Sequence, residues 1–460
     1  MTAERWSSRI GFLLATVGAA VGLGNIWRFS AVVGQNGGGA YLVPYLLAAL
    51  CCAVPLLVLE LAVGRTLRTD VVSAFRAGGP RYAVFGWVVV LSVLLILSYY
   101  LVLTGWVLGF LLSYAVDRPT TFATFTAGWA PVGAFLVTTA LTGGIVSLGV
   151  RDGIERAATV LLPTVFVALA GLAAYATTLA GWDRAVDFLF TPEFAVLADP
   201  GLWSAAVGQV FFSLSVGQGI MITYGGYVDD DTDLRRSAVL VTVADIGAAL
   251  IAGLVIFPVV FTFGLEPALG TELAFRTLPS AFEAMPFGRW VAIAFFGLLF
   301  FAALSSAVAM LEVGVTTVAT TTRADRPRAT VALTAGMAVL GLPSALSYSP
   351  VSLSLWDVPV LDLVDGTVGT LALPVSALLL TLTFVYGADL DLVRRELGGL
   401  YPVVKYVVPA VLLVVTAATI LGVTRPVWRL LTERTARPAL ALGVVLVLLC
   451  LGAVMRRPTR

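Results

Sequence analysis

The sequence predicts an all-α polytopic membrane protein, and three observations support that prediction. Hydrophobic residues make up 59% of the 460-residue chain and charged residues only 12%, about half the charged fraction of a soluble domain. The hydrophobic residues form runs that reach the ~20 residues needed to cross a ~30 Å hydrocarbon core. Two of these runs are interrupted by glycine and polar residues, which indicates irregular backbone inside the membrane.

Taken in order, the hydrophobic runs predict twelve transmembrane helices in one domain, 1–460. They span residues 10–30, 38–64, 83–115, 130–148, 154–178, 200–228, 236–264, 287–322, 328–348, 359–387, 403–424 and 437–455. The first and sixth runs each contain a Gly-x-Gly, and the third and eighth are both long. Five helices per half would make the second half enter from the opposite side. The pattern is therefore typical of an inverted repeat, 10–178 and 200–387, followed by two accessory helices, 403–455.

The first run contains Gly18, Gly22 and Gly24, which are poor helix formers, and Asn25 and Arg28, which are costly in lipid. A second such stretch runs from Ser213 to Gly219 about half a chain later. Non-helical backbone at this depth is tolerated only where it is buried in protein or lines a watery cavity. We therefore expect both helices to break and to turn their freed N–H and C=O groups toward a ligand.

Charge in the connections predicts the orientation. The 28 Lys and Arg residues divide into 19 on the side of the N-terminus and nine on the other, although the last outer loop, with four arginines, runs against the rule. Positive residues gather on the cytoplasmic side, so we expect both termini there, in a multi-pass protein of the plasma membrane. We expect a monomer or homodimer in the lipid bilayer. The net charge of +1 gives no reason to expect a nucleic-acid partner.

Several chemistries are excluded or disfavoured. The chain has no histidine, so an imidazole metal site and a histidine proton relay are excluded. Cys51, Cys52 and Cys450 lie in apolar runs, where we expect them to act as small apolar side chains. There is no Gly-x-Ser-x-Gly and no metal-ligand cluster in the sequence. An enzyme therefore ranks far below the other readings, and we expect no organic cofactor.

Three carboxylates stand isolated in the predicted helices: Glu60, Asp245 and Glu312. Such residues usually face the bundle interior and mark ion or substrate paths. We favour a functional role for Asp245 and a structural role for Glu60, pinning free N–H groups of a broken helix. Glu312 stays open between the two. Outside the helices, we expect the acidic run 229–233 to be a solvated loop and the apolar stretch 275–282 to form a re-entrant cap.

Two pairs of polar residues have two readings each. Ser305-Ser306 lies among small residues, which let helices approach closely, but two hydroxyls facing a broken helix also suit a hard cation. Tyr99-Tyr100 lies in the middle of the third run. A buried tyrosine hydroxyl needs a partner, which would be either an internal group or a ligand carboxylate. The residues alone leave both pairs open.

Several motifs in one order resemble the neurotransmitter:sodium symporter family, in particular its prokaryotic amino-acid transporters of the LeuT fold. They extend from Trp6 to about Tyr386 and include Val21-Gly-Leu-Gly-Asn-Ile-Trp-Arg-Phe29, Asn36-Gly-Gly-Gly-Ala-Tyr41, Pro44-Tyr45, Pro55 to Glu60, Gly153-Ile-Glu-Arg156, Ala206 to Ser215, Thr223-Tyr224 and Ser305-Ser306. The resemblance implies the LeuT-type 5+5 inverted repeat with discontinuous first and sixth helices. It also implies a sodium-coupled symporter that works by alternating access.

The resemblance further implies roles for individual residues. One of two sodium ions would be held by Gly18, Val21, Ala302, Ser305 and Ser306, and the other by Ala20, Asn25, Ser213, Asp245 and the substrate carboxylate. An amino-acid substrate would contact Ala20, Leu23, Gly24, Ile96, Tyr100, Phe212, Ser213, Ser215, Gln218, Ser306 and Met310. An outer gate would consist of Arg28 and Asp365, with Gln209 nearby and Phe212 as lid. A cytoplasmic gate would use Arg5, although the acidic partner usual in the family is missing from residues 313–322.

Departures from the family pattern narrow the function. Family members that carry monoamines have Asp where this chain has Gly22, which favours an amino acid as substrate. Asp245 replaces the Asn usual in chloride-dependent animal members and implies chloride independence, unless the alignment slips to Ala244. Gln218 replaces an aromatic or aliphatic residue, and either accepts a polar group or points away.

The pocket residues Ile96, Phe212 and Met310, with room left by Gly217, suggest a neutral hydrophobic or aromatic amino acid. A proton-coupled amino-acid symporter remains a competing hypothesis, because any of the three isolated carboxylates could titrate. A channel or a non-transporting amino-acid sensor on the same fold also remains open. A channel should show a continuous polar lining, whereas the polar residues here gather at the two breaks.

Overall fold

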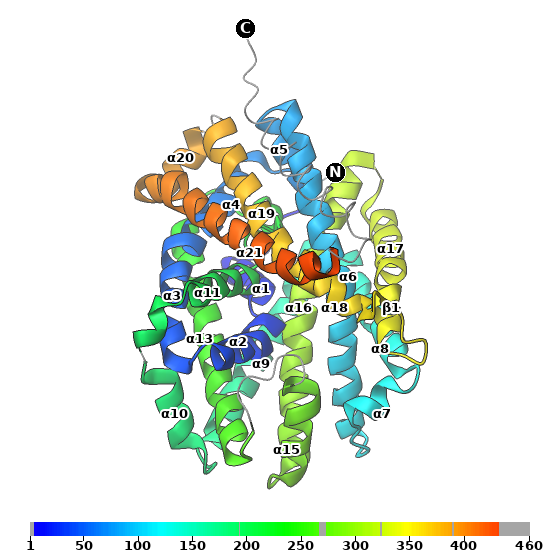
Figure 1. Ribbon diagram of the computed structural model, residues 1–460. Coiled ribbons are helices and arrows are strands. Elements are labelled where there is room, and N and C mark those ends of the chain that lie inside the picture. The colour runs from blue at the N-terminus through cyan, green and yellow to red at the C-terminus, as the bar shows by residue number, and fades with distance from the viewer. Residues whose placement is uncertain (1–3, 193, 266–272, 323, 389–390, 432–460) are drawn as a thin grey trace.

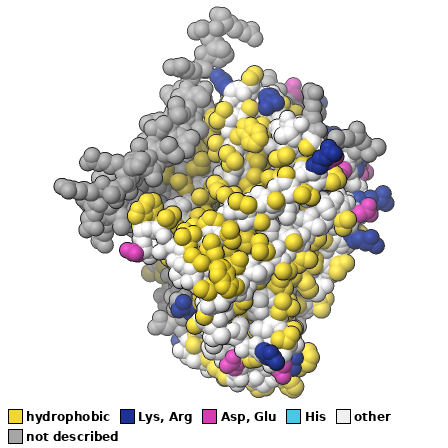
Figure 2. Space-filling view, turned by 90° about the vertical axis from the view of Figure 1, so that its right-hand side faces the viewer, with side chains coloured by type: hydrophobic (Ala, Val, Ile, Leu, Met, Phe, Trp, Pro, Cys, Tyr) yellow, Lys and Arg dark blue, Asp and Glu magenta, His cyan; other side chains and the backbone are white. Residues whose placement is uncertain are grey.

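The computed structural model describes residues 4–192, 194–265, 273–322, 324–388 and 391–431, and it shows a helical bundle with one small hairpin (Figure 1). Within these residues, nine helices are long and apolar enough to cross a membrane, and ten if one bent pair counts as a single span. The twelfth predicted helix, 437–455, lies outside the described residues. Figure 2 shows apolar side chains over the broad middle of one face, with charged side chains toward its ends, as expected for a surface in lipid.

The first five predicted helices all form. The first is broken into α1 (Arg9–Ala20), a π-helical turn (Gly24–Arg28) and α2 (Phe29–Gln35), with a bend of 50°. The second runs through a 3-10 turn (Gly38–Tyr41), α3 (Leu42–Ala48), a π-helical turn (Ala49–Ala53) and α4 (Val54–Leu67). The others are α6 (Ala83–Ala115), α8 (Ala130–Ser147), and a π-helical turn (Val150–Glu155) leading into α9 (Arg156–Ala176).

The second half repeats this plan. The sixth helix is broken into α11 (Pro200–Ser213) and α12 (Ile220–Gly225). It is followed by α13 (Leu234–Thr262), α16 (Gly288–Thr322) and α17 (Arg326–Ser347). The tenth comprises α18 (Val360–Val364), α19 (Thr370–Thr381) and the π-helical turns Asp365–Gly369 and Leu382–Gly387. The eleventh is a π-helical turn (Val403–Val407) and α21 (Val408–Leu431).

Short elements cover the two ends of the bundle. At one end in Figure 1 lie α7 (Phe122–Thr126), α10 (Trp182–Phe190) and α15 (Leu278–Ala284); at the other lie α5 (Val71–Ala77) and α20 (Asp391–Leu397). The remaining short pieces are 3-10 turns (Pro80–Tyr82, Phe194–Ala198, Gly398–Leu400), a π-helical turn (Leu273–Thr277) and the antiparallel strands β1 (Ser354–Leu355) and β2 (Val358–Pro359). The apolar stretch 275–282 does form a cap, because Phe275 and Phe282 are buried and Phe275 packs on Trp106 with ring centroids 5.6 Å apart.

Glycine determines where both central helices break. A Cβ atom at Gly22 would lie 2.6 Å from the Ser306 hydroxyl oxygen, and one at Gly24 would lie 2.9 Å from the Phe212 ring. At the second break, Gly217 and Gly219 have φ angles of 84° and 73°, in the left-handed region that favours glycine. The two breaks therefore face their neighbours with bare backbone, as the sequence predicts.

Long helices hold the breaks in place. The 33-residue α6 and the 35-residue α16 pack against each other, and α16 also packs against α1 and α9. The N-terminal half-helix α1 is enclosed further by α13 and α12. The two breaks consequently meet in the middle of the molecule, where the Ser215 hydroxyl donates to the Ala19 carbonyl at 2.9 Å.

Candidate functional site

A small cavity lies between the two breaks. Its walls come from α1, α6, α11, α16 and both breaks. It is lined by Ala20, Gly22, Gly24, Ile96, Tyr100, Phe212, Ser215, Gln218, Ser306 and Met310. The lining contains all of the substrate residues implied by the resemblance except Leu23 and Ser213, and it adds Gly22. The structure thus brings together residues that are up to 290 positions apart in the sequence.

One side of the cavity offers hydrogen-bond donors at the start of the half-helix that begins at Gly24. The Leu23 N–H donates to the Tyr100 hydroxyl oxygen at 3.3 Å, and the Gly22 N–H donates to Asn25 Oδ1 at 3.0 Å. The backbone amides at a helix N-terminus favour a negative charge. Leu23 therefore takes part through its backbone rather than its side chain, and the donor set suits a carboxylate.

The opposite side offers acceptors. Helix α1 ends at Ala20 and α11 ends at Ser213, and the carbonyl groups of a helix C-terminus favour a positive charge. The Ser215 hydroxyl reaches the Ala19 carbonyl from a backbone with φ 53°, a sparsely populated region for a residue other than glycine. A cavity with donors on one side and acceptors on the other matches a zwitterion.

Asp245 on α13 is fully buried and forms a small polar cluster beside the first break. Asn25 Nδ2 donates to Asp245 Oδ1 at 2.6 Å, and the Ser213 hydroxyl lies 2.9 Å from both carboxylate oxygens. The register therefore places Asp245, and not Ala244, at this position. None of the described ion pairs includes Asp245. A buried carboxylate without a cationic partner is costly, and the oxygen atoms gathered here suit a hard cation.

A second oxygen cluster joins α1 to α16. The Ser305 hydroxyl lies 2.8 Å from the carbonyls of both Gly18 and Ala302, and the Ser306 hydroxyl lies 3.2 and 3.3 Å from the same two atoms. A Cβ at Gly18 would come within 2.5 Å of Leu162 and 3.3 Å of Ser305, so glycine permits the close approach. Val21 is the residue after the last residue of α1, and its extended backbone ends the helix. These ligands are uncharged and suit a monovalent hard cation.

Glu60 lies on α4 behind the second break and is fully buried. Its Oε1 accepts the Gly217 N–H at 2.7 Å, an amide that the broken helix cannot use internally. Gln209 plays a similar part at the first break, because its Nε2 donates to the Gly24 carbonyl at 2.8 Å. Both side chains thus bind backbone groups at the breaks, and the Gly24 carbonyl also accepts the Phe29 N–H.

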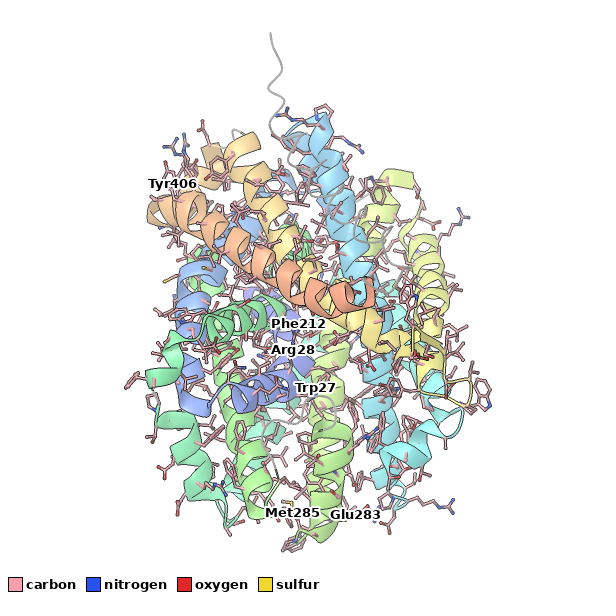
Figure 3. All side chains as sticks on the ribbon, in the orientation of Figure 1. Trp27, Arg28, Phe212, Glu283, Met285 and Tyr406 are labelled. Carbon is pink, nitrogen blue, oxygen red and sulfur yellow. The ribbon has the colours of Figure 1, made fainter. Side chains whose placement is uncertain are left out.

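The mouth nearer Arg28, here called the far mouth, differs from what the resemblance implied. The described ion pairs include none between Arg28 and Asp365. Instead the Arg28 guanidinium lies over the Phe212 ring, 4.2 Å from its centroid, and Figure 3 shows the two near the middle of the molecule (Figure 3). Gln209 binds the Gly24 carbonyl rather than either gate residue. A guanidinium in this position is attracted by the negative face of the aromatic ring.

The opposite mouth, here called the N-terminal mouth, is where residues 4–8 enter the bundle. Arg5 pairs with Asp229 at 3.2 Å, so the acid missing from residues 313–322 is supplied by the loop after α12. The acidic run is solvent-exposed, as expected, with Asp229 55% and Asp230 82% exposed, and it also supplies partners for basic residues. Asp230 pairs with Arg68 at 2.6 Å, and Asp233 caps α13 by accepting the Arg236 N–H at 3.0 Å.

The next three residues of this segment bind other elements of the bundle, and Trp6 is the buried one of the three. Trp6 is 6% exposed and stacks edge-on against Tyr224, with ring centroids 5.1 Å apart, while its Nε1 donates to the Tyr224 carbonyl. Glu155, in the π-helical turn before α9, accepts from the Ser7 N–H at 2.7 Å, the Ser7 hydroxyl at 2.6 Å and the Ser8 hydroxyl at 3.0 Å. Each residue from 4 to 8 therefore makes a contact that helps to close this mouth.

Glu312 lies at the N-terminal mouth and has a structural role, because it links α16 to α17 and to the loop after α12. It is fully buried and holds the Arg326 guanidinium through both oxygens, at 2.6 and 3.0 Å, while the Tyr227 hydroxyl donates to it at 2.7 Å. Arg326 also reaches Glu4 at 3.2 Å, and Glu4 accepts the Val150 N–H at 3.0 Å. Sequence reasoning missed Arg326 and Glu4, because no local spacing links residues 322 positions apart.

Comparison with known proteins shows what the chain is similar to. The model of the sodium:neurotransmitter symporter family matches residues 3–131 and 126–424. An uncharacterised sodium-dependent transporter of Bacillus subtilis, YhdH, is 37% identical over 393 residues, covering 82% of this chain and 86% of the relative. A second, from Methanocaldococcus jannaschii, is 34% identical over 417 residues, covering 85% and 83%.

Two further relatives concern amino acids. The bovine sodium-dependent neutral amino acid transporter B(0)AT2 is 30% identical over 295 residues, which cover 55% of this chain and 40% of that protein. The crystal structure of MhsT in complex with L-phenylalanine superposes with a TM-score of 0.83 at 37% identity, covering 90% of this chain and 99% of MhsT. The inverted repeat, the two broken helices and the motifs now agree with these matches. The chain belongs to the sodium:neurotransmitter symporter family, has the LeuT fold and is a sodium-dependent transporter rather than an enzyme.

Proposed function

We propose that the protein imports a neutral hydrophobic or aromatic amino acid together with two sodium ions, by alternating access and without chloride. The observation that carries this proposal is the central cavity, which has donors on one side, acceptors on the other and an oxygen cluster beside it. The apolar lining residues Ile96, Phe212 and Met310 favour an apolar side chain. A dry site must satisfy both charges of a zwitterion, and this cavity can do so with backbone groups.

The Asp245 cluster supplies the coupling. Asn25 contacts Asp245 and also accepts the Gly22 N–H next to the donors for the substrate carboxylate. A sodium ion held by Ala20, Asn25, Ser213 and Asp245 would sit beside that carboxylate and share it as a ligand. Each of the two would then bind more tightly in the presence of the other, and this coupling is reciprocal.

The Ser305–Ser306 cluster would hold the second ion. Its four oxygen atoms come from α1 and α16, with the Val21 carbonyl as a further ligand. A cation there would draw the N-terminal half-helix against α16, which is the arrangement with the N-terminal mouth closed. Sodium binding would thereby favour the conformation in which the N-terminal mouth is closed before the substrate binds.

The orientation follows from the charge count in the sequence. The side carrying residues 4–8 also holds the majority of the arginines, so we infer that the N-terminal mouth faces the cytoplasm and that α7, α10 and α15 lie outside. Import then proceeds from the far mouth to the N-terminal mouth, across a plasma membrane. The monomer or homodimer expected from the sequence remains part of this proposal.

Binding measurements on purified protein test the proposal. Tritiated leucine and tryptophan should bind in Na⁺ but not in K⁺, and equally with chloride or with gluconate as the anion. Asp245→Asn should weaken sodium-dependent binding about tenfold or more and make it respond to chloride, because the fixed negative charge is gone. The matched control is Asp231→Asn, an exposed acid of the loop after α12, which should leave binding unchanged.

Other outcomes would replace the proposal. Binding in K⁺ as strong as in Na⁺, with uptake into proteoliposomes driven by a pH gradient, would favour the proton-coupled symporter. Glu60 is the residue to test in that case, because its Oε2 is buried and has no hydrogen-bond partner among the described residues. Sodium-dependent binding with no uptake into proteoliposomes would favour the amino-acid sensor.

A further inference from the structure

Among the described residues that line the cavity, Gln218 has a buried polar atom without a hydrogen-bond partner. It lies in the second break, is 5% exposed and lines the cavity. Its Oε1 is sealed from solvent and accepts no hydrogen bond from any described residue. A carboxamide offers two donors and an acceptor with two lone pairs, and leaving such groups buried and unpaired destabilises a protein.

The other polar side chains of the cavity are satisfied. Tyr100 accepts the Leu23 N–H, Ser306 donates to the Gly18 carbonyl, and Ser215 donates to the Ala19 carbonyl. These three belong to the parts of the site that suit the backbone of an amino acid and the ions. Gln218 is therefore an exception that the fold of the protein itself does not explain.

The backbone holds Gln218 in place. It is flanked by Gly217 and Gly219, both in the left-handed region. Glu60 fixes the Gly217 N–H, and a Cβ at Gly217 would lie 2.9 Å from the Ala377 nitrogen on α19, so this part of the break has little room to move. The side chain cannot readily leave the cavity to find a partner elsewhere.

The rest of the side-chain part of the cavity is apolar. Ile96 and Met310 line it, and its described lining contains no charged residue. A charged substrate side chain would find no counter-ion there. What the lining matches is an uncharged side chain, mostly hydrocarbon, with one group able to hydrogen-bond.

We propose that Gln218 is a specificity-determining residue that pairs with a hydrogen-bonding group on the substrate side chain. The inference rests on the proposed function and narrows its substrate class. Tyrosine, through its hydroxyl, and tryptophan, through its indole N–H, are preferred over phenylalanine and leucine. A site built to hydrogen-bond a substrate group rejects the analogue that lacks it, because the polar group of the site is then left unpaired.

Matched pairs of amino acids test the inference. Purified wild-type protein is assayed for sodium-dependent binding of tritiated tyrosine and phenylalanine, which differ by one hydroxyl, and in competition for threonine and valine, which are similar in shape. We expect tyrosine to bind about tenfold or more tightly than phenylalanine. Gln218→Met, which keeps the length but removes the hydrogen-bonding groups, should bring the tyrosine to phenylalanine ratio close to one.

Ile96→Val is the control variant, because it changes the volume of the same cavity without touching a hydrogen bond. It should shift both affinities in parallel and leave their ratio unchanged. Retained sodium-dependent phenylalanine binding by Gln218→Met shows that this variant is folded. If Gln218→Met does not fold, the affinities of the wild-type protein for the matched pairs of amino acids still test the inference.

The two proposals fail in different ways. If no amino acid of the twenty binds in a sodium-dependent manner, the proposed function is wrong. If sodium-dependent binding is present but the wild type binds tyrosine and phenylalanine equally, and threonine and valine equally, the inference about Gln218 is wrong and the proposed function stands. A hydroxyl preference that persists unchanged in Gln218→Met also overturns it.

Discussion

The two mouths of the central cavity are closed by different kinds of contact. At the N-terminal mouth, residues 4–8 bind four separate parts of the bundle through ion pairs, hydrogen bonds and one buried indole. At the far mouth, the described contacts of Arg28 with the lid are a single cation–π contact with Phe212. Such a contact contributes ~0.5–2 kcal/mol, whereas the N-terminal mouth combines several interactions of at least that size.

The two mouths differ in how easily their individual contacts are lost. The single Arg28–Phe212 contact is lost at low energetic cost, while residues 4–8 detach only when several contacts are lost together. We therefore expect the Arg28–Phe212 contact to break before residues 4–8 leave the N-terminal mouth. The contacts of the N-terminal mouth are also unequal, because they range from buried to half exposed. Replacing these contacts one at a time should rank them by their contribution to closing the N-terminal mouth. Opening of this mouth can be followed by backbone hydrogen exchange over residues 4–15, measured by mass spectrometry.

The largest effect should come from Arg326→Gln, because Arg326 holds the fully buried Glu312. Removing one partner leaves an uncompensated buried charge, which costs roughly 3 kcal/mol or more. We expect exchange over residues 4–15 to rise about 100-fold, with little change over α2 at the far mouth. The control is Arg328→Gln, two positions on, whose contact with Asp325 is at 3.5 Å with the arginine 84% exposed. Equal exchange in the two variants would show that the buried tie does not hold this mouth.

An intermediate effect should come from Glu155→Ala. It removes the acceptor of three hydrogen bonds from Ser7 and Ser8, and hydrogen bonds to a charged acceptor contribute ~1.5–3 kcal/mol each before water replaces part of that loss. We expect exchange to rise about 10- to 30-fold. Asp152→Ala, an exposed acid on the same turn, serves as control. An effect as large as that of Arg326→Gln would invert the ranking and make Glu155 the main tie.

The smallest effect should come from Arg5→Ala. Arg5 and Asp229 are 52% and 55% exposed, and exposed pairs contribute ~0–1 kcal/mol. We expect at most a fivefold rise in exchange, and none in 1 M choline chloride, where screening already weakens the pair. Arg9→Ala, on the exposed first turn of α1, provides the comparison. A tenfold or greater rise that survives high salt would mean that Arg5 does more than pair with Asp229.

The sequence predicted those parts of the molecule that local chemistry determines. The hydrophobic runs located the first eleven helices to within a few residues, and the glycines at 22, 24, 217 and 219 located both breaks, because bare backbone has few uses in a membrane. An isolated acid in an apolar run identified Asp245, since an unpaired charge there is costly. The resemblance then placed the cavity residues, and only the structure showed that Gln218 turns inward without a partner.

The sequence did not predict the contacts between distant surface segments. Arg5 lies 224 residues from Asp229, and either could have paired with several other charges. Arg28 lies over a ring rather than beside Asp365, because small shifts of helix ends decide which partner a long side chain reaches. Such choices depend on tertiary geometry, and residue spacing carries little information about them.

The tie between Glu4 and Arg326 has a consequence for how the protein is made. The two residues are 322 positions apart, so during synthesis Glu4 has to wait for the ninth helix before the tie can form. At about 5–20 residues per second, that delay is on the order of tens of seconds. This one tie cannot form before that time, whereas the contacts of residues 4–8 with Val150, Glu155, Tyr224 and Asp229 involve parts of the chain made earlier. In this protein, the complete set of contacts at the N-terminal mouth therefore forms only after the ninth helix has been made.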